Sequence, residues 1–541
     1  MDAEAAPRGL ELAALEAEQE PPPAEAPSPQ LPPPHRDPIP PPDAEKNGLV
    51  MKIPPEDEEG EEAAALGGAG GDLSGGPKFT GLGKEELLRE AGTPLWSRAR
   101  KVLLVLFWGG WLGMLGAAAA IVAQAPRCQP LPAKAWWELG PLYRAPPKAF
   151  GGDLRGVEKR LGYLKEKLQV GGLVLGPVYP PKAPGDKIPP LGQLDPALGT
   201  SQDFAALVDT AKDKGLKVIL DLTPNPWGGP VWGDAAADLG VQQQVQEALR
   251  HWLKEDIAGI FLDGIEELPA SVVADWRNLT EHQPSPSGVA RVLVGGTRLQ
   301  EPWKLPQHPG APQLLVGPFL QPLEPPQPPG ESPPSALRAL LAFLAAGSSS
   351  SSSPRLGWSV GSPWESWVSP KLRLQQLLLV WALPGTPVLS YGDELGLQRP
   401  PKNQELPPMP WEIIEAIKTG GNASKAPAEL ELCSALSPLR ARELSLLLGE
   451  ARAVAAGPGA LALLRRWDRS PRYLLLLNPH GDELRPLWGH GRPAGEPPLP
   501  AEVTLRFSTA PAGAGQPELR LHEVSVGPYQ GMLLAFPSEP Q

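Results

Sequence analysis

Two aspartates stand where a repeated strand pattern would place reactive side chains. Asp221 ends the apolar run VILD, and Asp263 directly follows the run GIFL. In a barrel of parallel strands, side chains at the carboxyl ends of the strands share one mouth and carry the chemistry. Carboxylates in that position can act as nucleophile or as general acid. The seven histidines are scattered without metal-ligand spacing, so we predict neither a metal site nor a cofactor.

Short apolar runs that alternate with helical stretches would position these aspartates. The runs begin beyond Trp136 and are bounded by turn residues, which is typical of parallel strands buried on both faces. Eight such units predict an α/β fold of the (β/α)8 TIM-barrel type. The expected strands are Pro141–Arg144, Gly172–Gly176, Val218–Asp221, Gly259–Asp263, Arg291–Gly295, Leu314–Val316, Leu356–Val360 and Val388–Tyr391.

After about Ser445 the pattern becomes all-β, and we expect a small antiparallel β-sandwich there. The serine run Ser348–Ser353 is expected to be an insertion in a surface loop of the barrel. The expected strands of the β-domain are Ala460–Trp467, Arg472–Asn478, Val503–Phe507 and Met532–Phe536.

The segment Val102–Ala123 contains no charged residue. A helix of this length rises about 33 Å, which is enough to cross the hydrocarbon core of a bilayer. Arg98, Arg100 and Lys101 precede the segment, and only Arg127 follows closely. The positive-inside rule therefore places the N-terminus in the cytosol and the barrel outside.

A cleaved signal peptide is the alternative reading of this segment, because Ala123-Gln124-Ala125 resembles a cleavage site. The roughly 100 residues ahead of it favour an uncleaved signal anchor. Those residues are proline-rich and acidic, so we expect a disordered tail with one short helix in Lys78–Gly92. The expected domains are a tail (1–97), a transmembrane helix (98–124), a neck (125–135), a barrel (136–445) and a β-sandwich (446–541).

Features on either side of the membrane fit this topology. Asn278 and Asn422 begin glycosylation sequons, and both follow the span. Gly109, Gly113 and Ala117 lie four residues apart on one side of the span, where small residues permit close packing of a second membrane helix. The net charge of −12 argues against nucleic acid as a partner and leaves membrane lipid and protein.

Three segments resemble the α-amylase superfamily of glycoside hydrolases. They are LGYLKEKLQVGGLVLGPVY from Leu161, LDPALGTSQDFAALVDTAKDKGLKVILDLTPNP from Leu194, and ALPGTPVLSYGDELGL from Ala382. The resemblance covers about residues 136–541 and implies a barrel followed by a β-domain. It also allows the positions of the catalytic residues to be compared one by one.

By this resemblance, Asp263 stands at the position of the nucleophile, but Phe261 replaces the arginine two residues before it. Gly296 replaces the acid, and Trp364 replaces the third carboxylate. Double displacement needs two carboxylates, so we predict that the chain has no catalytic residues and is not an enzyme. Asp263 is then expected to be a solvated or hydrogen-bonded strand end.

Two further positions of the family pattern persist. Asp221 and Asn225 are present, whereas Pro226 replaces the histidine that follows the third strand in the family. Without the catalytic carboxylates, Asp221 and Asn225 are expected to be structural groups at the end of a strand.

An inactive amylase-like barrel on such an anchor resembles the heavy subunits of heteromeric amino-acid transporters. The carrying segments are AEKNGLV from Ala44, KFTGLGKEELL from Lys78, LLVLFWGGWLGMLG from Leu103, and APRCQPLPAKAWWELGPLYR from Ala125. The resemblance implies a subunit that binds a polytopic light chain, stabilises it and carries it to the plasma membrane, on the basolateral side in epithelia. It also implies a disulfide to the light chain at the cysteine just outside the membrane, which Cys128 matches.

Two alternatives remain open from the sequence. Cys128 could instead pair with Cys433, although Cys433 in ELCSALSPL is expected to pack as a small hydrophobe. The chain could also be an adhesion or signalling scaffold, because the resemblance includes association with integrins. A membrane-bound α-glucosidase-like enzyme is disfavoured by the missing carboxylates.

Overall fold

The computed structural model describes most of the chain beyond residue 82. Cys128, Trp364, Asn422 and residues 349–353 of the serine run lie outside the described residues. The described ranges are 83–124, 131–226, 230–305, 309–321, 333–348, 355–360, 369–398, 406–418, 426–457, 459–488, 499–510 and 518–538.

Two helices precede the barrel. Helix α1 covers Lys84–Ala91, within the segment predicted to hold a short helix, and α2 covers Pro94–Gln124. The short helix expected in this part of the tail is therefore present as α1. Within the described ranges, α2 is the one helix long and apolar enough to cross a membrane. It contains the whole uncharged segment and starts several residues earlier, because Pro94 fits the first turn of a helix.

The eight predicted parallel strands are all present and close into a barrel. Each strand pairs with its neighbours in chain order, and β8 pairs with β1. The predicted barrel is confirmed, with strand ends displaced by one or two residues. The strands are β1 Leu142–Ala145, β2 Gly172–Leu175, β3 Lys217–Asp221, β4 Gly259–Leu262, β5 Val292–Gly296, β6 Leu314–Gly317, β7 Arg355–Ser359 and β8 Thr386–Ser390.

Apolar side chains from the strands fill the inside of the barrel, among them Ile219, Phe261 and Val388. Helix α3 (Trp136–Leu139) lies at the end where the strands begin. The indole of Trp136 donates to the carbonyl of Ala290 at 2.8 Å, and Trp136 and Trp137 both pack against the interior cluster. Helix α3 therefore lies at the end of the barrel opposite the mouth where the two aspartates lie.

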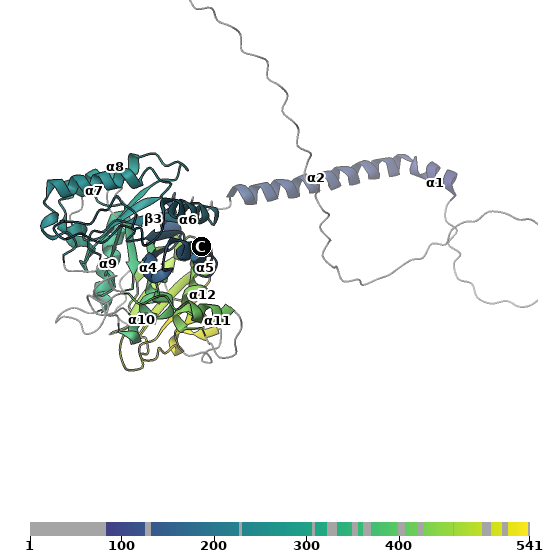
Figure 1. Cartoon of the computed structure of the whole chain (residues 1–541). Helices are drawn as coiled ribbons and strands as arrows, with labels where there is room; N and C mark the ends of the chain where they lie inside the picture. The colour runs from purple at the N-terminus through teal and green to yellow at the C-terminus, as the bar shows by residue number, and fades with distance from the viewer. Residues whose placement is uncertain are drawn as a thin grey trace, which may run out of the picture. The chain divides into compact units, whose positions relative to one another are not determined.

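Helices surround the barrel, and local capping groups define where several of them begin. Asp153 accepts from the amide of Gly156 at the start of α5, and Thr200 and Asp203 form a capping box on α6. Helices α7 and α8 pack side by side (Figure 1). The helices are α4 Pro147–Phe150, α5 Leu154–Leu168, α6 Ser201–Asp213, α7 Leu239–Trp252, α8 Ala270–His282, α9 Pro333–Ser348 and α10 Pro370–Ala382.

An antiparallel β-domain follows the barrel, as the sequence predicted. Its described strands form one six-stranded sheet in the order β13-β12-β14-β11-β10-β9. The helices before it are α11 Trp411–Lys418, α12 Ala428–Arg442 and α13 Leu444–Leu447. The strands are β9 Glu450–Ala453, β10 Leu461–Arg466, β11 Arg472–Leu477, β12 Glu502–Ser508, β13 Glu518–Arg520 and β14 Gly531–Phe536.

Both faces of this sheet are apolar, which is the pattern that favoured a sandwich. Leu475 and Leu533 belong to the large core shared with the barrel helices, whereas Leu474 and Leu534 belong to a second cluster on the opposite face. Irregular segments carrying Trp488 cover that second face in the described part of the chain. Among the described residues, the layer over that face therefore consists of loops, which alternation along the strands cannot distinguish from a second sheet.

Candidate functional site

A buried ion pair occupies the barrel mouth at the carboxyl ends of β1 and β3. The guanidinium of Arg144 donates to Asp221 at 3.1 Å, and both side chains are almost fully buried. The same guanidinium lies 4.2 Å from the centre of the Phe261 ring. Phe261 stands where the family has an arginine, so the cation at this mouth comes from β1 instead. The sequence analysis did not identify Arg144.

Hydrogen bonds tie the two aspartates together through Thr223. The Thr223 hydroxyl donates to Asp221 at 2.5 Å and accepts from the backbone amide of Asp263 at 3.0 Å. Burial raises the pKa of Asp221, against the opposing effects of Arg144 and Thr223. Asp221 is thus a buried carboxyl group held by Arg144 and Thr223.

Asp263 is a buried, hydrogen-bonded strand end. It is 3% exposed, its Oδ1 accepts from the amide of Gly264 at 2.9 Å, and its carbonyl accepts from the Trp232 indole at 2.8 Å. The hydrogen-bonded alternative is confirmed, and the solvated one is wrong because the side chain is almost fully buried.

Position 296 has no space for a side chain. A Cβ at Gly296 would lie 2.4 Å from Oδ1 of Asp263 and 2.9 Å from Cζ of Phe261. The carboxylate of Asp263 and the ring of Phe261 therefore occupy the space that the first atom of a glutamate would need. A retaining glycosidase holds two carboxyl groups about 5–5.5 Å apart, and this strand contributes none.

Two glutamates just after Asp263 hold the loops around the mouth. Glu267 accepts from the backbone amides of Val231, Trp232 and Gly233 at 2.8–3.0 Å. Glu266 accepts from the backbone amide of Arg298 at 2.8 Å, and burial raises its pKa. Both were missed from the sequence, where neighbouring acids in a loop suggest only a solvated surface.

The other predicted site residues do not join this cluster. Asn225 is exposed in the loop after β3, where its amide donates to the carbonyl of Pro230 at 3.2 Å. Asn278 is exposed on α8, whereas the Thr280 hydroxyl of its sequon is buried and donates to the carbonyl of Trp276. Trp364 and Asn422 cannot be placed, because they lie outside the described residues.

The remaining predictions concern the membrane helix and the cysteines. Gly109, Gly113 and Ala117 all lie on α2, and a Cβ at either glycine would meet nothing within 4 Å. Cys433 is a free, fully buried thiol on α12, and burial raises its pKa. It packs as a small hydrophobe, as expected. Cys128 lies outside the described residues.

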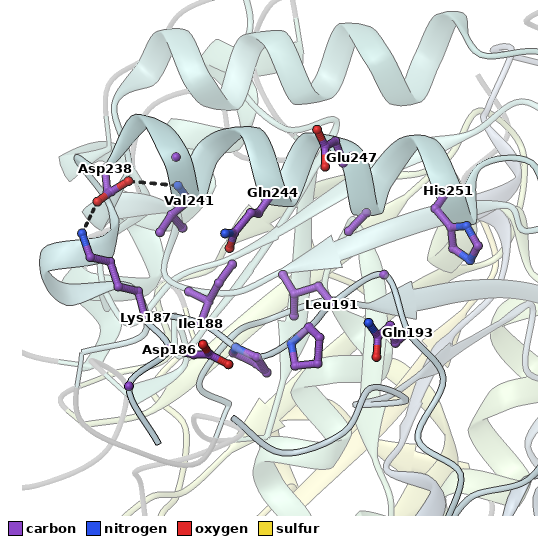
Figure 2. A pocket seen from close by; sticks show the side chains of 16 residues that line it. Asp186, Lys187, Ile188, Leu191, Gln193, Asp238, Val241, Gln244, Glu247 and His251 are labelled. Atoms are coloured by element: carbon purple, nitrogen blue, oxygen red, sulfur yellow. Dashed lines mark hydrogen bonds and ion pairs between the residues drawn. The ribbon is translucent and has the colours of Figure 1, made fainter. Parts of the chain in front are cut away.

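A groove of about 730 Å³ lies away from these positions, between the loop 185–193 and α7 (Figure 2). The ion pair of Lys187 with Asp238 lies at its rim, and the Trp252 indole ties the helix to the carbonyl of Leu191 at 2.7 Å. Its lining residues are Gly185, Asp186, Lys187, Ile188, Pro189, Pro190, Leu191, Gly192, Gln193, Asp238, Gly240, Val241, Gln244, Glu247, Ala248 and His251. None of them is a position predicted for the catalytic site.

Comparisons with known proteins agree with this architecture. Residues 116–230 match the profile of the α-amylase catalytic domain. The α-amylase of Geobacillus thermoleovorans has a TM-score of 0.52 and 18% identity, covering 75% of this chain and 100% of that one. The maltogenic α-amylase AmyB of Thermotoga neapolitana gives a TM-score of 0.53 at 15% identity, with 74% and 100% covered. The fold is therefore that of an α-amylase-type barrel with a β-domain.

Relatives that match along nearly the whole chain identify the family within this fold class. Residues 73–143 match the profile of the solute carrier family 3 member 2 N-terminus. The amino acid transporter heavy chain SLC3A2 of Mus musculus is 35% identical over 532 residues, which are 91% of this chain and 93% of that protein. The Oryctolagus cuniculus protein is 35% identical, with 91% and 92% covered. The chain belongs to the SLC3A2 family of amino acid transporter heavy chains, and the resemblance noted from the sequence is confirmed.

A second group of heavy chains matches over a shorter stretch. The amino acid transporter heavy chain SLC3A1 of Homo sapiens is 30% identical over 169 residues, which are 30% of this chain and 24% of that protein. The similarity to SLC3A2 proteins therefore extends along almost the whole chain, whereas that to SLC3A1 is partial.

Proposed function

We propose that this protein is a non-enzymatic heavy subunit that binds a polytopic amino-acid transporter light chain, stabilises it and delivers it to the plasma membrane. One observation carries the proposal: the similarity to SLC3A2 heavy chains runs along about nine-tenths of the chain. It includes the segment from 73 to 143, which contains the membrane helix and the neck. Amino-acid exchange would then be the activity of the light chain.

The barrel serves in this proposal as an outer domain without catalysis. Position 296 has no space for the glutamate that serves as the acid in α-amylases. The ring of Phe261, at the position of an arginine in α-amylases, packs against the guanidinium of Arg144. The carboxylate of Asp263 is held by the amide of Gly264 beside a residue that provides no second carboxyl. These contacts support the proposal that the barrel mouth is stably packed but no longer catalytic.

The proposed anchor is α2 in type II orientation, with the N-terminus in the cytosol. Arg98, Arg100 and Lys101 lie in its first turns, and its last turn carries no basic residue. Cys128 follows Gln124 by four residues, so its thiol stays within roughly 14 Å of the end of the helix along the chain. We propose that Cys128 forms the disulfide to the light chain. Because Cys128 stays close to the outer surface of the membrane, its partner cysteine would lie in an outer loop of the light chain.

Contacts within the membrane would assemble the complex before the disulfide forms. The glycines at 109 and 113 leave open space on one side of α2, so a partner helix can approach the backbone closely. Because the two subunits are then already held together, formation of the disulfide is effectively intramolecular. Once formed, the disulfide makes dissociation of the two subunits rare. Glycans on Asn278 and Asn422 would mark the outer side.

A replacement experiment tests this role. In cells depleted of their own heavy chain, expression of this chain should restore a light chain at the surface together with amino-acid uptake. A variant in which Val102–Ala123 is replaced by an unrelated membrane span should itself reach the surface. It should restore less surface light chain and less amino-acid uptake than the intact chain. If the chain with its own span fails to bring the light chain to the surface, the proposal is contradicted. Turnover of an α-glucoside abolished by Asp263→Asn would contradict its non-enzymatic part.

A further inference from the structure

The short helix α1, which precedes the membrane helix, has an apolar side that is left uncovered. By helical spacing, Leu87, Leu88 and Ala91 fall on one side of α1, and Glu86 and Arg89 fall on the opposite side. Leu87 is 55% exposed and Leu88 is 64% exposed, and no apolar cluster of the described residues includes either leucine. A helix of eight residues is marginal in water by itself, so α1 needs a surface that covers its apolar side.

The first two turns of α2 repeat this pattern. Leu95, Trp96 and Ala99 have the same i, i+1, i+4 spacing, and the side chains of Leu95 and Trp96 are exposed. The uncharged segment begins only at Val102, so these turns precede the part of the helix that can cross the hydrocarbon core. Tryptophan is enriched where membrane proteins pass through the headgroup layer. The first turns of α2 therefore suit the membrane interface.

The connection between the two helices keeps the end of α1 close to the start of the span. Pro94 begins α2 and has no amide hydrogen with which to continue α1, and the chain bends at Thr93. The guanidinium of Arg100 donates to the carbonyl of Ala91, the last residue of α1, at 3.3 Å. Arg100 lies two residues before the uncharged segment. The end of α1 therefore lies within one arginine side chain of the hydrocarbon boundary.

Positive charge is concentrated around this connection. Between residues 84 and 101 there are five basic and three acidic residues, whereas the whole chain has a net charge of −12. A basic residue close to an anionic leaflet favours binding to that leaflet by a factor of about five. The basic residues are Lys84, Arg89, Arg98, Arg100 and Lys101.

We propose that α1 lies on the cytoplasmic leaflet, with its apolar side in the interface, and binds the headgroups of anionic phospholipids. The apolar side of α1 is joined directly to a membrane helix and is surrounded by excess positive charge, so anionic lipid suits it better than a protein partner does. Leu87 and Leu88 enter the interface, and the basic side chains contact lipid phosphates and carboxylates. The choice of leaflet rests on the cytosolic N-terminus in the proposed function.

Hydrogen–deuterium exchange of the purified full-length chain in lipid nanodiscs tests this surface. Discs of phosphatidylcholine alone are compared with discs that also contain phosphatidylserine, each with one composition in both leaflets. The amides of Lys84–Ala91 should exchange more slowly in the phosphatidylserine discs, because bound lipid stabilises the hydrogen-bonded helix. The amides of Leu461–Arg466 in the β-domain should exchange equally in both. Neither orientation nor a light chain enters this assay, so its outcome is separate from that of the replacement experiment.

Single substitutions separate the two sides of α1. Leu88→Gln should remove most of the slow exchange, because it places a polar group on the apolar side. Glu86→Gln is the matched control, since it introduces the same residue on the opposite side and should keep the slow exchange. Arg89→Gln should reduce the difference between the two kinds of disc by about fivefold.

Three results would overturn the proposal. The first is equal exchange of α1 in the two kinds of disc, and the second is slow exchange that persists in Leu88→Gln. The third is slow exchange that arises only after a purified light chain is added. In that case the apolar side of α1 would bind the light chain, and the assignment to lipid would be wrong.

Discussion

Replacing Gly296 by alanine should destabilise the barrel, although it adds only one methyl group. The new Cβ would lie 2.4 Å from Oδ1 of Asp263, 2.8 Å from its Cγ and 2.9 Å from Cζ of Phe261. Carbon–carbon contacts are optimal near 3.5–4.0 Å, so the neighbours must retreat by roughly 1 Å. Asp263 cannot retreat freely, because the amide of Gly264 and the hydroxyl of Thr223 hold its residue in place.

The expected loss follows from two opposing effects. Overpacking of a well-packed interior costs about 1–3 kcal/mol. The reduced flexibility of the unfolded chain returns about 0.4–1 kcal/mol when glycine becomes alanine. We therefore expect a net destabilisation of about 1–2 kcal/mol and a lower unfolding midpoint.

Urea unfolding of the full-length chain, followed by tryptophan fluorescence, measures this difference. Gly162→Ala is the matched control, because its Cβ would meet only Glu166 at an ordinary 3.6 Å inside α5, and it should be neutral or stabilising. In a double-mutant cycle, Asp263→Ala should reduce the cost of Gly296→Ala by removing the atoms that clash. If Gly296→Ala proved as stable as the parent chain, position 296 would have room for a side chain and our account of the mouth would fail.

Three further predictions concern the core, the partner bond and the span. Glu394 is fully buried and its pKa is raised to about 7 by burial, so stability should fall as pH rises from about 4.5 through 7. Glu394→Gln should reduce the difference in unfolding free energy between pH 5 and pH 8 by up to about 3 kcal/mol, and an unchanged pH profile would refute this. Cys128→Ser should abolish the high-mass band on a non-reducing gel while leaving part of the complex in mild detergent, and a persistent covalent partner would exclude Cys128. Gly113→Leu should weaken co-purification of the light chain more than Ala118→Leu on the opposite side of the helix, and equal effects would remove the small-residue side as the docking surface.

Periodicity along the sequence was sufficient to predict the main architecture. Each barrel strand combines apolar residues with flanking turn residues, and the closed barrel follows because parallel strands must be covered on both faces. Four strands of the β-domain were also predicted from their apolar residues, whereas the edge strands β9 and β13 were not. The loops of the domain's second layer were not predicted either, because loops bearing apolar residues bury a sheet as effectively as strands do.

The site was only partly predictable for a different reason. Comparison by position identified Asp263, Phe261 and Gly296, but it could not show that the first two fill the space of a side chain at the third. Arg144 and Asp221 are 77 residues apart, and nothing local to either indicates that they pair. Such contacts depend on which strand ends meet at the mouth, and that is fixed only when the barrel closes.

Trp136 shows the same limit at the other end of the barrel. In the sequence it opens the barrel region just before the first predicted strand, and nothing there indicates what it contacts. In the folded chain it packs against the apolar interior of the barrel, and its indole donates to the carbonyl of Ala290, 154 residues away in sequence.

The most direct test of the central claim is purification of the native complex from membranes in mild detergent, followed by mass spectrometry of every stoichiometric partner. Our account predicts one polytopic amino-acid transporter, bound in equal amount and released from its covalent link by reduction at Cys128. Recovery of the chain without any polytopic membrane partner, from cells in which it resides at the surface, would contradict the account.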